Sequence, residues 1–195
     1  APVPPDWNGV SELQNGPLKK AAVQLLLAGP THRLEILLTR RSDKLRLHAG
    51  QVSFPGGKPE AGDETPAMTA ARECQEETGL SAQLITHLGY LEPVLTSTNY
   101  LVDQVLGYCE EDPRQLETLL QPDPAEVDMT WFTPLAPFLI IDAYKRSERL
   151  TEDGRLRRFW EIPHSDPMIW GATAQMLRNL AVWLNTRIQP ELDSL

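Results

Sequence analysis

Apolar and polar residues alternate with two different spacings along the chain, and the first spacing is typical of strands. Two apolar runs, AAVQLLLA (21–28) and LEILLTR (34–40), are separated by a Gly-Pro pair and polar residues. Runs of this length with such boundaries predict two adjacent strands. A shorter run, QVSF (51–54), ends at a Pro-Gly-Gly sequence and predicts a third strand.

From Thr65 onwards the spacing becomes helical. Small and apolar residues recur every three or four positions on one face, at Ala67, Ala70, Ala71, Cys74 and Thr78. Thr65 can cap the start, Pro66 suits the first turn, and Gly79 suits the left-handed position just past the end. The pattern predicts an α-helix over 66–78.

The remaining patterns predict further strands and one more helix. Strands are expected near 83–92, 100–109 and 126–133, an extended hairpin over 143–162 with its turn at Glu152-Asp153-Gly154, and a helix over roughly 171–188. This mixture predicts the α+β class. Residues 1–17 hold four prolines with little periodicity and predict an N-terminal arm, while residues 18–195 predict a single domain.

The composition narrows the possible partners. A net charge of -9 disfavours nucleic acid and anionic membranes, because an acidic body repels them at long range. No apolar run approaches the ~20 residues of a membrane span, and the start APVPPDWNGV has no signal-peptide pattern. Two cysteines are too few for a disulfide framework. We therefore expect a cytoplasmic protein that does not bind membranes or nucleic acid.

Three glutamates on the predicted helix are the first candidates for chemistry. Glu73, Glu76 and Glu77 stand at i, i+3 and i+4, so at 3.6 residues per turn they share a face about 100° wide, opposite the alanine and Cys74 stripe. Adjacent carboxylates repel one another, yet together they offer oxygen ligands suited to Mg²⁺ or Mn²⁺. An isolated E-x-x-E-E is more often a solvated acidic face, so its context decides.

That context is the run GGKPEAGDETPAMTAARECQEETGL (56–80), which closely resembles the Nudix box. The Arg-Glu pair, the Glu-Glu pair, the glycine and the final aliphatic residue all match in register. The loop before the helix holds one extra residue compared with the box. Either Asp63 or Glu64 can therefore take the place of the loop acid that pairs with Arg72, and the sequence leaves the choice open.

The resemblance implies the Nudix fold, a mixed β-sheet sandwiched between α-helices, and hydrolysis of a nucleoside diphosphate linked to a further group. It also implies Mg²⁺ or Mn²⁺ held by Glu73, Glu76, Glu77 and the main-chain carbonyl of Gly56. Such cations are needed because water must attack a phosphorus shielded by negative oxygens. Glu76 or Glu77 is expected to accept the proton, and the glycines at 56 and 57 let the backbone approach the site closely.

A second motif lies directly before the box, in LLTRRSDKLRLHAGQVSFPGG (37–57). Its pattern, L-L-T-x-R-S, three residues, R, three residues, G, three residues and F-P-G-G, resembles the coenzyme A branch of the Nudix hydrolases at every fixed position. The resemblance continues at 122–135 and 169–177. It implies cleavage of coenzyme A to adenosine 3',5'-bisphosphate and 4'-phosphopantetheine.

The same stretch concentrates positive charge in an acidic chain. From Arg40 to Lys58, five Lys or Arg residues and one histidine stand against a single acid. Basic side chains beside the glycines suit phosphate recognition, and the candidate substrate-binding residues are Arg41, Arg46, His48, Gln51 and Lys58. A second basic group lies on the predicted hairpin 143–162, where a role in ligand binding is a hypothesis.

Two other functions compete with this interpretation. A Nudix enzyme for another dinucleotide, such as NADH or ADP-ribose, would not need the motif at 37–57. A nucleotide-binding module without catalysis would have little need for three mutually repelling carboxylates. The sequence does not choose between Mg²⁺ and Mn²⁺, between free and acylated or oxidised coenzyme A, or between oligomeric states.

Overall fold

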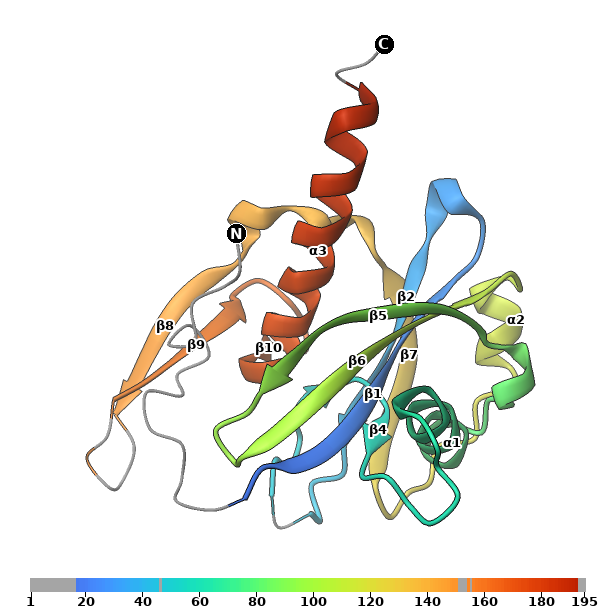
Figure 1. Cartoon of the computed structure of the whole chain (residues 1–195), viewed down its shortest axis with the longest axis horizontal. Coiled ribbons are helices and arrows are strands. Elements are labelled where there is room, and N and C mark those ends of the chain that lie inside the picture. The colour runs from blue at the N-terminus through green and yellow to red at the C-terminus, as the bar shows by residue number, and fades with distance from the viewer. Residues whose placement is uncertain (1–16, 46, 151–153, 155, 193–195) are drawn as a thin grey trace. The chain divides into compact units, whose positions relative to one another are not determined.

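The structure is a computed structural model that describes residues 17–45, 47–150, 154 and 156–192 (Figure 1), with only the backbone described beyond Arg187. The chain falls into two compact units, which are described separately. The first combines Lys20–Glu92 and Val102–Ala136; the second contains the described parts of 1–19, 93–101 and 137–195. The single domain over 18–195 stays a prediction, and residues 1–16 of the expected arm lie outside the described residues.

Seven strands form the larger sheet. In chain order they are β1 (Lys19–Ala28), β2 (Glu35–Arg41), β3 (Val52–Ser53), β4 (Gly56–Gly57), β5 (Thr86–Leu95), β6 (Tyr100–Cys109) and β7 (Val127–Pro134). The strand order is β3-β2-β1-β6-β5, with β4 also paired to β1 and β7 to β2. The antiparallel pairing of β2 with β7 runs from Glu35 opposite Pro134 to Arg41 opposite Val127, with an irregularity between Arg40 and Arg41.

Most predicted strands are confirmed, and the differences have local causes. The strand expected over 51–54 shortens to β3, and the glycines after it form β4 because they pair with Ala22 and Val23 of β1. The strand expected over 83–92 begins later because Ser81 caps a 3-10 turn by accepting a hydrogen bond from Gln83 N–H. Helix α2 (Pro113–Glu117) was not predicted, since five residues are too few to show a period.

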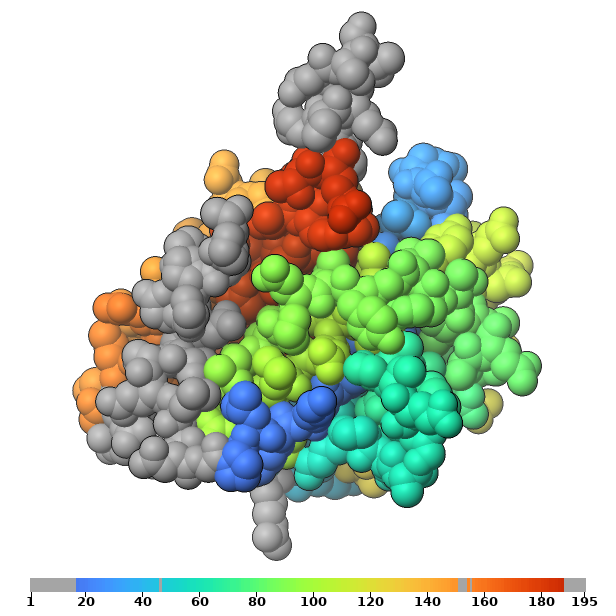
Figure 2. Space-filling view, in the orientation of Figure 1, coloured from blue at the N-terminus to red at the C-terminus, as the bar shows by residue number. Residues whose placement is uncertain are grey.

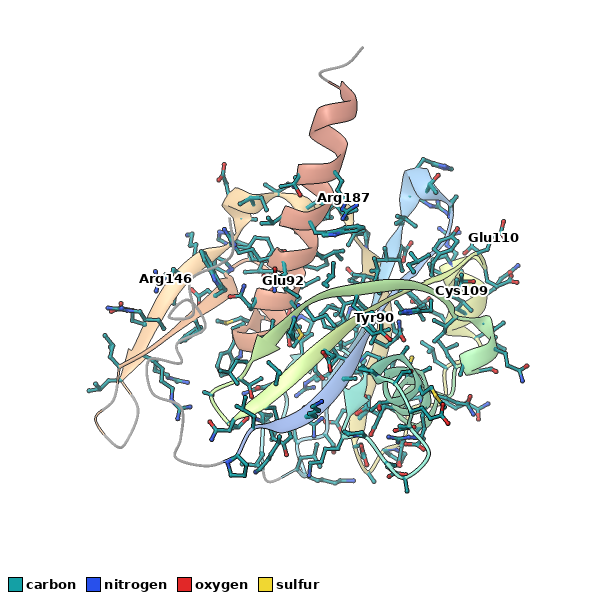
Figure 3. All side chains as sticks on the ribbon, viewed as in Figure 1. Tyr90, Glu92, Cys109, Glu110, Arg146 and Arg187 are labelled. Atoms are coloured by element: carbon teal, nitrogen blue, oxygen red, sulfur yellow. The ribbon has the colours of Figure 1, made fainter. Side chains whose placement is uncertain are left out.

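The core of the first unit joins the sheet to helix α1 (Pro66–Thr78). Its main cluster consists of Leu26, Ala28, Leu37, Cys74, Leu80, Cys109, Leu116 and Phe132. Burying each large side chain contributes roughly 1.5–3 kcal/mol. The inward position of Cys74 is confirmed, and Cys109 lies at the end of β6 (Figure 3). Both thiols are free and buried.

The second unit is a three-stranded sheet with one long helix. Strands β8 (Lys145–Leu150), β9 (Leu156–Ile162) and β10 (Ile169–Trp170) are antiparallel in the order β10-β9-β8, and α3 spans Gly171–Leu192. The predicted hairpin and the helix start are confirmed, whereas the helix runs four residues beyond 188. Two residues of the expected turn, Glu152 and Asp153, lie outside the described residues. Within the described chain, no helix combines the length and apolarity of a membrane span.

Candidate active site

Helix α1 is fixed at both ends by the residues that the sequence singled out. The Thr65 hydroxyl accepts a hydrogen bond from Met68 N–H at 3.2 Å, and Pro66 occupies the first turn. Gly79 adopts the left-handed conformation with φ of 80° and donates its N–H to Gln75 O at 2.8 Å. A side chain there would also collide with Gln121. These contacts fix the rotation of α1 and therefore the direction of its glutamates.

Glu77 points inward, although the sequence placed it on a face opposite the core. Its exposed fraction is only 3%, whereas the Glu76 side chain is 57% exposed. The Glu77 carboxylate accepts a hydrogen bond from Gly56 N–H at 3.2 Å. The pairing of β4 with β1 places that N–H beside the helix. The β4 turn therefore covers this side of the helix at Glu77, which the sequence did not predict.

Glu73 lies against the second glycine of the turn. Its side chain is 15% exposed, and a Cβ atom added to Gly57 would collide with its carboxylate. A Cβ added to Gly56 would instead collide with the backbone of β1, at Ala22 and Val23. The two glycines therefore serve different purposes: Gly56 permits the strand pairing and Gly57 makes room for Glu73. Figure 2 shows α1 and the segment before it, in teal, at the surface of the viewed face.

Arg72 ties the loop and the helix together. Its Nη2 donates to Asp63 Oδ2 at 3.0 Å and to the Lys58 carbonyl at 2.9 Å. The same guanidinium contacts Glu73 at 3.1 Å and Glu76 at 2.7 Å. Glu64, the alternative loop acid, is exposed and makes no ion pair with Arg72. The extra loop residue is therefore accommodated with Asp63, not Glu64, against the arginine.

Burial and neighbouring charges shift the protonation of these groups. Burial raises the pKa of Glu77 to about 8, while the charge of Arg41 and the Gly56 N–H oppose the shift. Burial also raises the pKa of Glu73, against the effect of Arg72. Hydrogen bonds from Arg72 lower the pKa of Asp63. Burial thus disfavours the charged form of Glu73 and Glu77 on the helix, whereas Arg72 favours the charged form of Asp63 in the loop.

A further carboxylate, Glu126, was missed by the sequence analysis. Its charge is a minor cause of the raised pKa of both Glu73 and Glu77, which makes it a further candidate for the site. Its main chain is anchored on both sides: Ser42 N–H donates to Glu126 O at 2.8 Å, and the turn residue Asp123 donates its N–H to Glu77 O at 3.3 Å. The sequence offered one indication of this residue: in PDPAEVD (122–128), Glu126 is the acid that immediately precedes strand β7.

Of the predicted substrate-binding side chains, the structure relates only that of Arg41 to the glutamates, among the residues that it describes. Arg41, at the end of β2, acts electrostatically on Glu77, and its buried Nε has no hydrogen-bond partner among the described residues. His48 and Gln51 contact each other at 2.9 Å through Nδ1 and Oε1, in an exposed loop. The Lys58 side chain is exposed, and its carbonyl binds Arg72. Arg46 lies outside the described residues.

The oxygen donors of the site match the chemistry of Mg²⁺ or Mn²⁺. Glu73, Glu77 and Glu126 are hard oxygen ligands whose repulsion and burial a divalent cation would relieve. Across the part of the chain that the structure describes, however, no three His, Cys, Asp or Glu side chains are already gathered as a metal site. Arg72 contacts Oε1 of Glu73 at 3.1 Å, and Gly56 N–H donates to Oε2 of Glu77 at 3.2 Å, so each of these contacts is made with one oxygen of its carboxylate.

Sequence comparison assigns the chain to a family. The NUDIX domain model matches residues 18–153. Nudix hydrolase 15, mitochondrial, from Arabidopsis thaliana is 37% identical over 163 residues, which cover 82% of this chain and 56% of that protein. A Nudix hydrolase named NudL from Photorhabdus laumondii is 38% identical over 148 residues, or 75% of each chain. The chain therefore belongs to the Nudix family, and the α+β Nudix fold is confirmed.

Solved structures agree on the fold. An Ap4A hydrolase from C. elegans matches with a TM-score of 0.53 and 16% identity over 87% of this chain and 99% of that one. The Nudix hydrolase RenU from M. smegmatis matches with a TM-score of 0.50 and 22% identity over 65% and 76%. The chain spans only 56% and 53% of two Arabidopsis relatives, named as mitochondrial and chloroplastic. The cytoplasmic location therefore stays a prediction.

Proposed function

We propose that this chain hydrolyses the diphosphate of coenzyme A with Mg²⁺ or Mn²⁺, releasing adenosine 3',5'-bisphosphate and 4'-phosphopantetheine. The observation that carries the proposal is the continuity of two motifs. The basic stretch 37–57 runs directly into the glutamate helix, and its Arg41 acts on the buried Glu77. Positive charge for a phosphate and carboxylates for a cation are thus supplied by consecutive segments of one unit.

In this proposal Glu73, Glu77 and the Gly56 carbonyl hold the cation, with Glu126 as an added ligand. When bound there, the cation would supply charge neutralisation on the diphosphate and a lower pKa for the attacking water. Arg72 holds Glu73 and Glu76 in place, and Asp63 holds Arg72. Glu76 or Glu77 accepts the proton of the water. Glu76 has the solvent access needed to release that proton, whereas Glu77 is enclosed by Gly56.

Coenzyme A differs from NADH and ADP-ribose by its 3'-phosphate and its thiol-ended arm. Recognition of the extra phosphate is assigned to Arg41, with Arg46, His48, Gln51 and Lys58 as further candidates. The Nε of Arg41 supports this role, because within the described part of the chain this buried nitrogen has no hydrogen-bond acceptor. A bidentate arginine contact with phosphate provides both energy and orientation.

Product analysis tests the proposal directly. The protein is incubated with Mg²⁺ and, separately, with coenzyme A, dephospho-coenzyme A, NADH and ADP-ribose, and the products are resolved by mass. We expect coenzyme A to be cleaved in preference to dephospho-coenzyme A, its matched control without the 3'-phosphate. Preferred cleavage of NADH or ADP-ribose would retain the Nudix chemistry and overturn the substrate assignment. Binding of these nucleotides without any cleavage would favour the non-catalytic module.

A further inference from the structure

The β8–β9 hairpin of the second unit carries an unusual concentration of positive charge. Its strands hold five cationic residues, Lys145, Arg146, Arg149, Arg157 and Arg158, and two acids, Glu148 and Glu161. The net charge of these strands is therefore +3 (five minus two), in a chain whose total is -9. The rest of the chain consequently carries -12 (-9 minus 3). Local positive charge on such an acidic protein calls for a specific physical explanation.

Two of the arginines stand directly opposite each other. The strand register pairs Arg149 with Arg157, so their side chains emerge on the same face of the hairpin. Like charges in this position destabilise a strand pair. Among the residues that the structure describes, neither arginine has a carboxylate partner; Arg157 Nη1 donates only to the Ser97 hydroxyl, at 3.4 Å. By contrast, Arg158 on the other face is paired with Glu148 at 2.6 Å.

The face that carries Arg149 and Arg157 is the one turned away from α3. Trp160, whose position alternates with theirs, packs its ring under Arg178 of α3, with 4.4 Å from the guanidinium carbon to the ring centroid. Strand parity places Phe159 on the arginine face. Helix α3 therefore covers the Trp160 face and leaves the arginine face without a helix. Arg146, labelled in Figure 3, belongs to the Trp160 face.

Aromatic rings lie next to the arginine pair. Phe159 contacts Trp170 of β10 edge to face, with ring centroids 5.4 Å apart, and both side chains are partly exposed. Glu161, the one acid on this face of strands β8 and β9 as described, lies at the other end, opposite Lys145, and accepts a hydrogen bond from the Ser147 hydroxyl at 2.7 Å. The face thus combines two guanidinium groups, a hydroxyl and an aromatic edge, with its carboxylate kept away from the arginines.

We propose that this face is a binding site for a nucleotide, with its phosphate on Arg149, Arg157 and the Ser97 hydroxyl and its base against Phe159 and Trp170. Arginine pairs bind phosphate through short, charge-assisted hydrogen bonds, and aromatic side chains stack with bases. A long polyanion fits less well, because the remaining charge of -12 repels it at distances beyond this small face. The site is independent of the proposed hydrolysis, since none of its residues belongs to the first unit.

Binding of adenosine monophosphate is measured by NMR through the indole signal of Trp170, assigned with Trp170→Phe, in buffer with EDTA and no metal. We expect the signal to shift with adenosine monophosphate, and more weakly with adenosine or inorganic phosphate alone. Arg149→Gln and Arg157→Gln should each weaken binding about tenfold, the effect of losing one charge-assisted hydrogen bond. Arg158→Gln, on the opposite face, is the matched control and should change binding less than about twofold.

The same variants distinguish binding at a specific site from a nonspecific effect of the hairpin's positive charge. Removing one of two like charges should leave the unfolding temperature unchanged or higher, so weaker binding by Arg149→Gln or Arg157→Gln cannot come from misfolding. Added nucleotide should raise the unfolding temperature of the unmodified chain more than that of either variant. Equal weakening by Arg158→Gln, or a Trp170 signal that does not respond to adenosine monophosphate, would overturn the proposal.

Discussion

Like charges lie side by side in two regions of this molecule, and the regions differ in how far the chain compensates them. Around α1, the carboxylates of Glu73 and Glu77 are enclosed by protein, with Arg72 and Arg41 nearby. On the hairpin, Arg149 and Arg157 stand opposite each other, and neither has a carboxylate partner within the described residues. Burial raises the pKa of both glutamates, with repulsion from neighbouring carboxylates as a smaller cause, whereas water screens the repulsion between the two arginines. A bound cation would relieve the burial of charge at α1, as in the proposed function, whereas water screening lets the hairpin keep its two arginines without a bound anion.

The largest expected effect comes from removing the buried member of the carboxylate pair. Glu77→Gln should lower turnover of the preferred substrate by more than the ~100-fold typical of losing an outer-shell partner of a metal site. Glu77→Gln keeps the shape of the side chain, so the fold should remain intact by circular dichroism. Steady-state kinetics with Mg²⁺ measure the loss. Full activity of the variant would show that Glu77 has no role in the reaction. The proposed difference between the buried carboxylates and the exposed arginines would then be wrong.

The two glycines of β4 allow the activity of the α1 region to be separated from its stability. Gly57→Ala meets the flexible end of Glu73, so we expect a folded protein with activity reduced by about tenfold or more as Glu73 is displaced. Gly56→Ala meets the rigid backbone of β1 and should cost about 1–3 kcal/mol of folding free energy. Urea unfolding and kinetics on both variants separate the two effects. Equal loss of stability in both would contradict the different purposes assigned to these glycines.

The sequence predicted this site better than it predicted the surroundings of the site. The period of 66–78 and its flanking Thr65 and Gly79 predicted α1 correctly because helix caps are local features. The sequence could not place Glu77 in the interior, because the burial of Glu77 depends on β4 folding over the helix. Glu126 was missed for the same reason: its turn is placed by hydrogen bonds between residues distant in sequence, from Ser42 N–H to Glu126 O and from Asp123 N–H to Glu77 O.

The hairpin illustrates a different limit. Its strands were predicted from their composition and turn signal, and its positive charge was visible in the sequence. The opposition of Arg149 to Arg157 was not, because a shift of one residue in register would move each side chain to the other face. Only the observed register separates these two arginines from Arg158 and its partner Glu148.

A smaller effect is expected from the loop acid that supports Arg72. Asp63→Asn weakens the ion pair that orients Arg72, and through it Glu73, so activity should fall by about tenfold. Glu64→Gln is the matched control, because Glu64 is exposed and makes no contact with Arg72. Kinetics of the two variants under identical Mg²⁺ concentrations provide the measurement. A larger loss for Glu64→Gln would mean that Glu64, not Asp63, supports the arginine in the working enzyme.

The smallest effect is a pH dependence of stability that should arise at α1 and not at the hairpin. Because burial raises the pKa of Glu77 from 4.5 to about 8, the folded chain keeps a proton that the unfolded chain has lost between these values. In metal-free buffer, folding stability should therefore fall as the pH rises through this window, by on the order of 3 kcal/mol from this group. Urea unfolding between pH 5 and about 8 should show the decline in the unmodified chain and a smaller decline in Glu77→Gln. Arg157→Gln should retain the full decline, since an arginine does not titrate in this range. Parallel curves for the unmodified chain and Glu77→Gln would mean that the buried carboxylate is already compensated, and the electrostatic difference between the two regions would disappear.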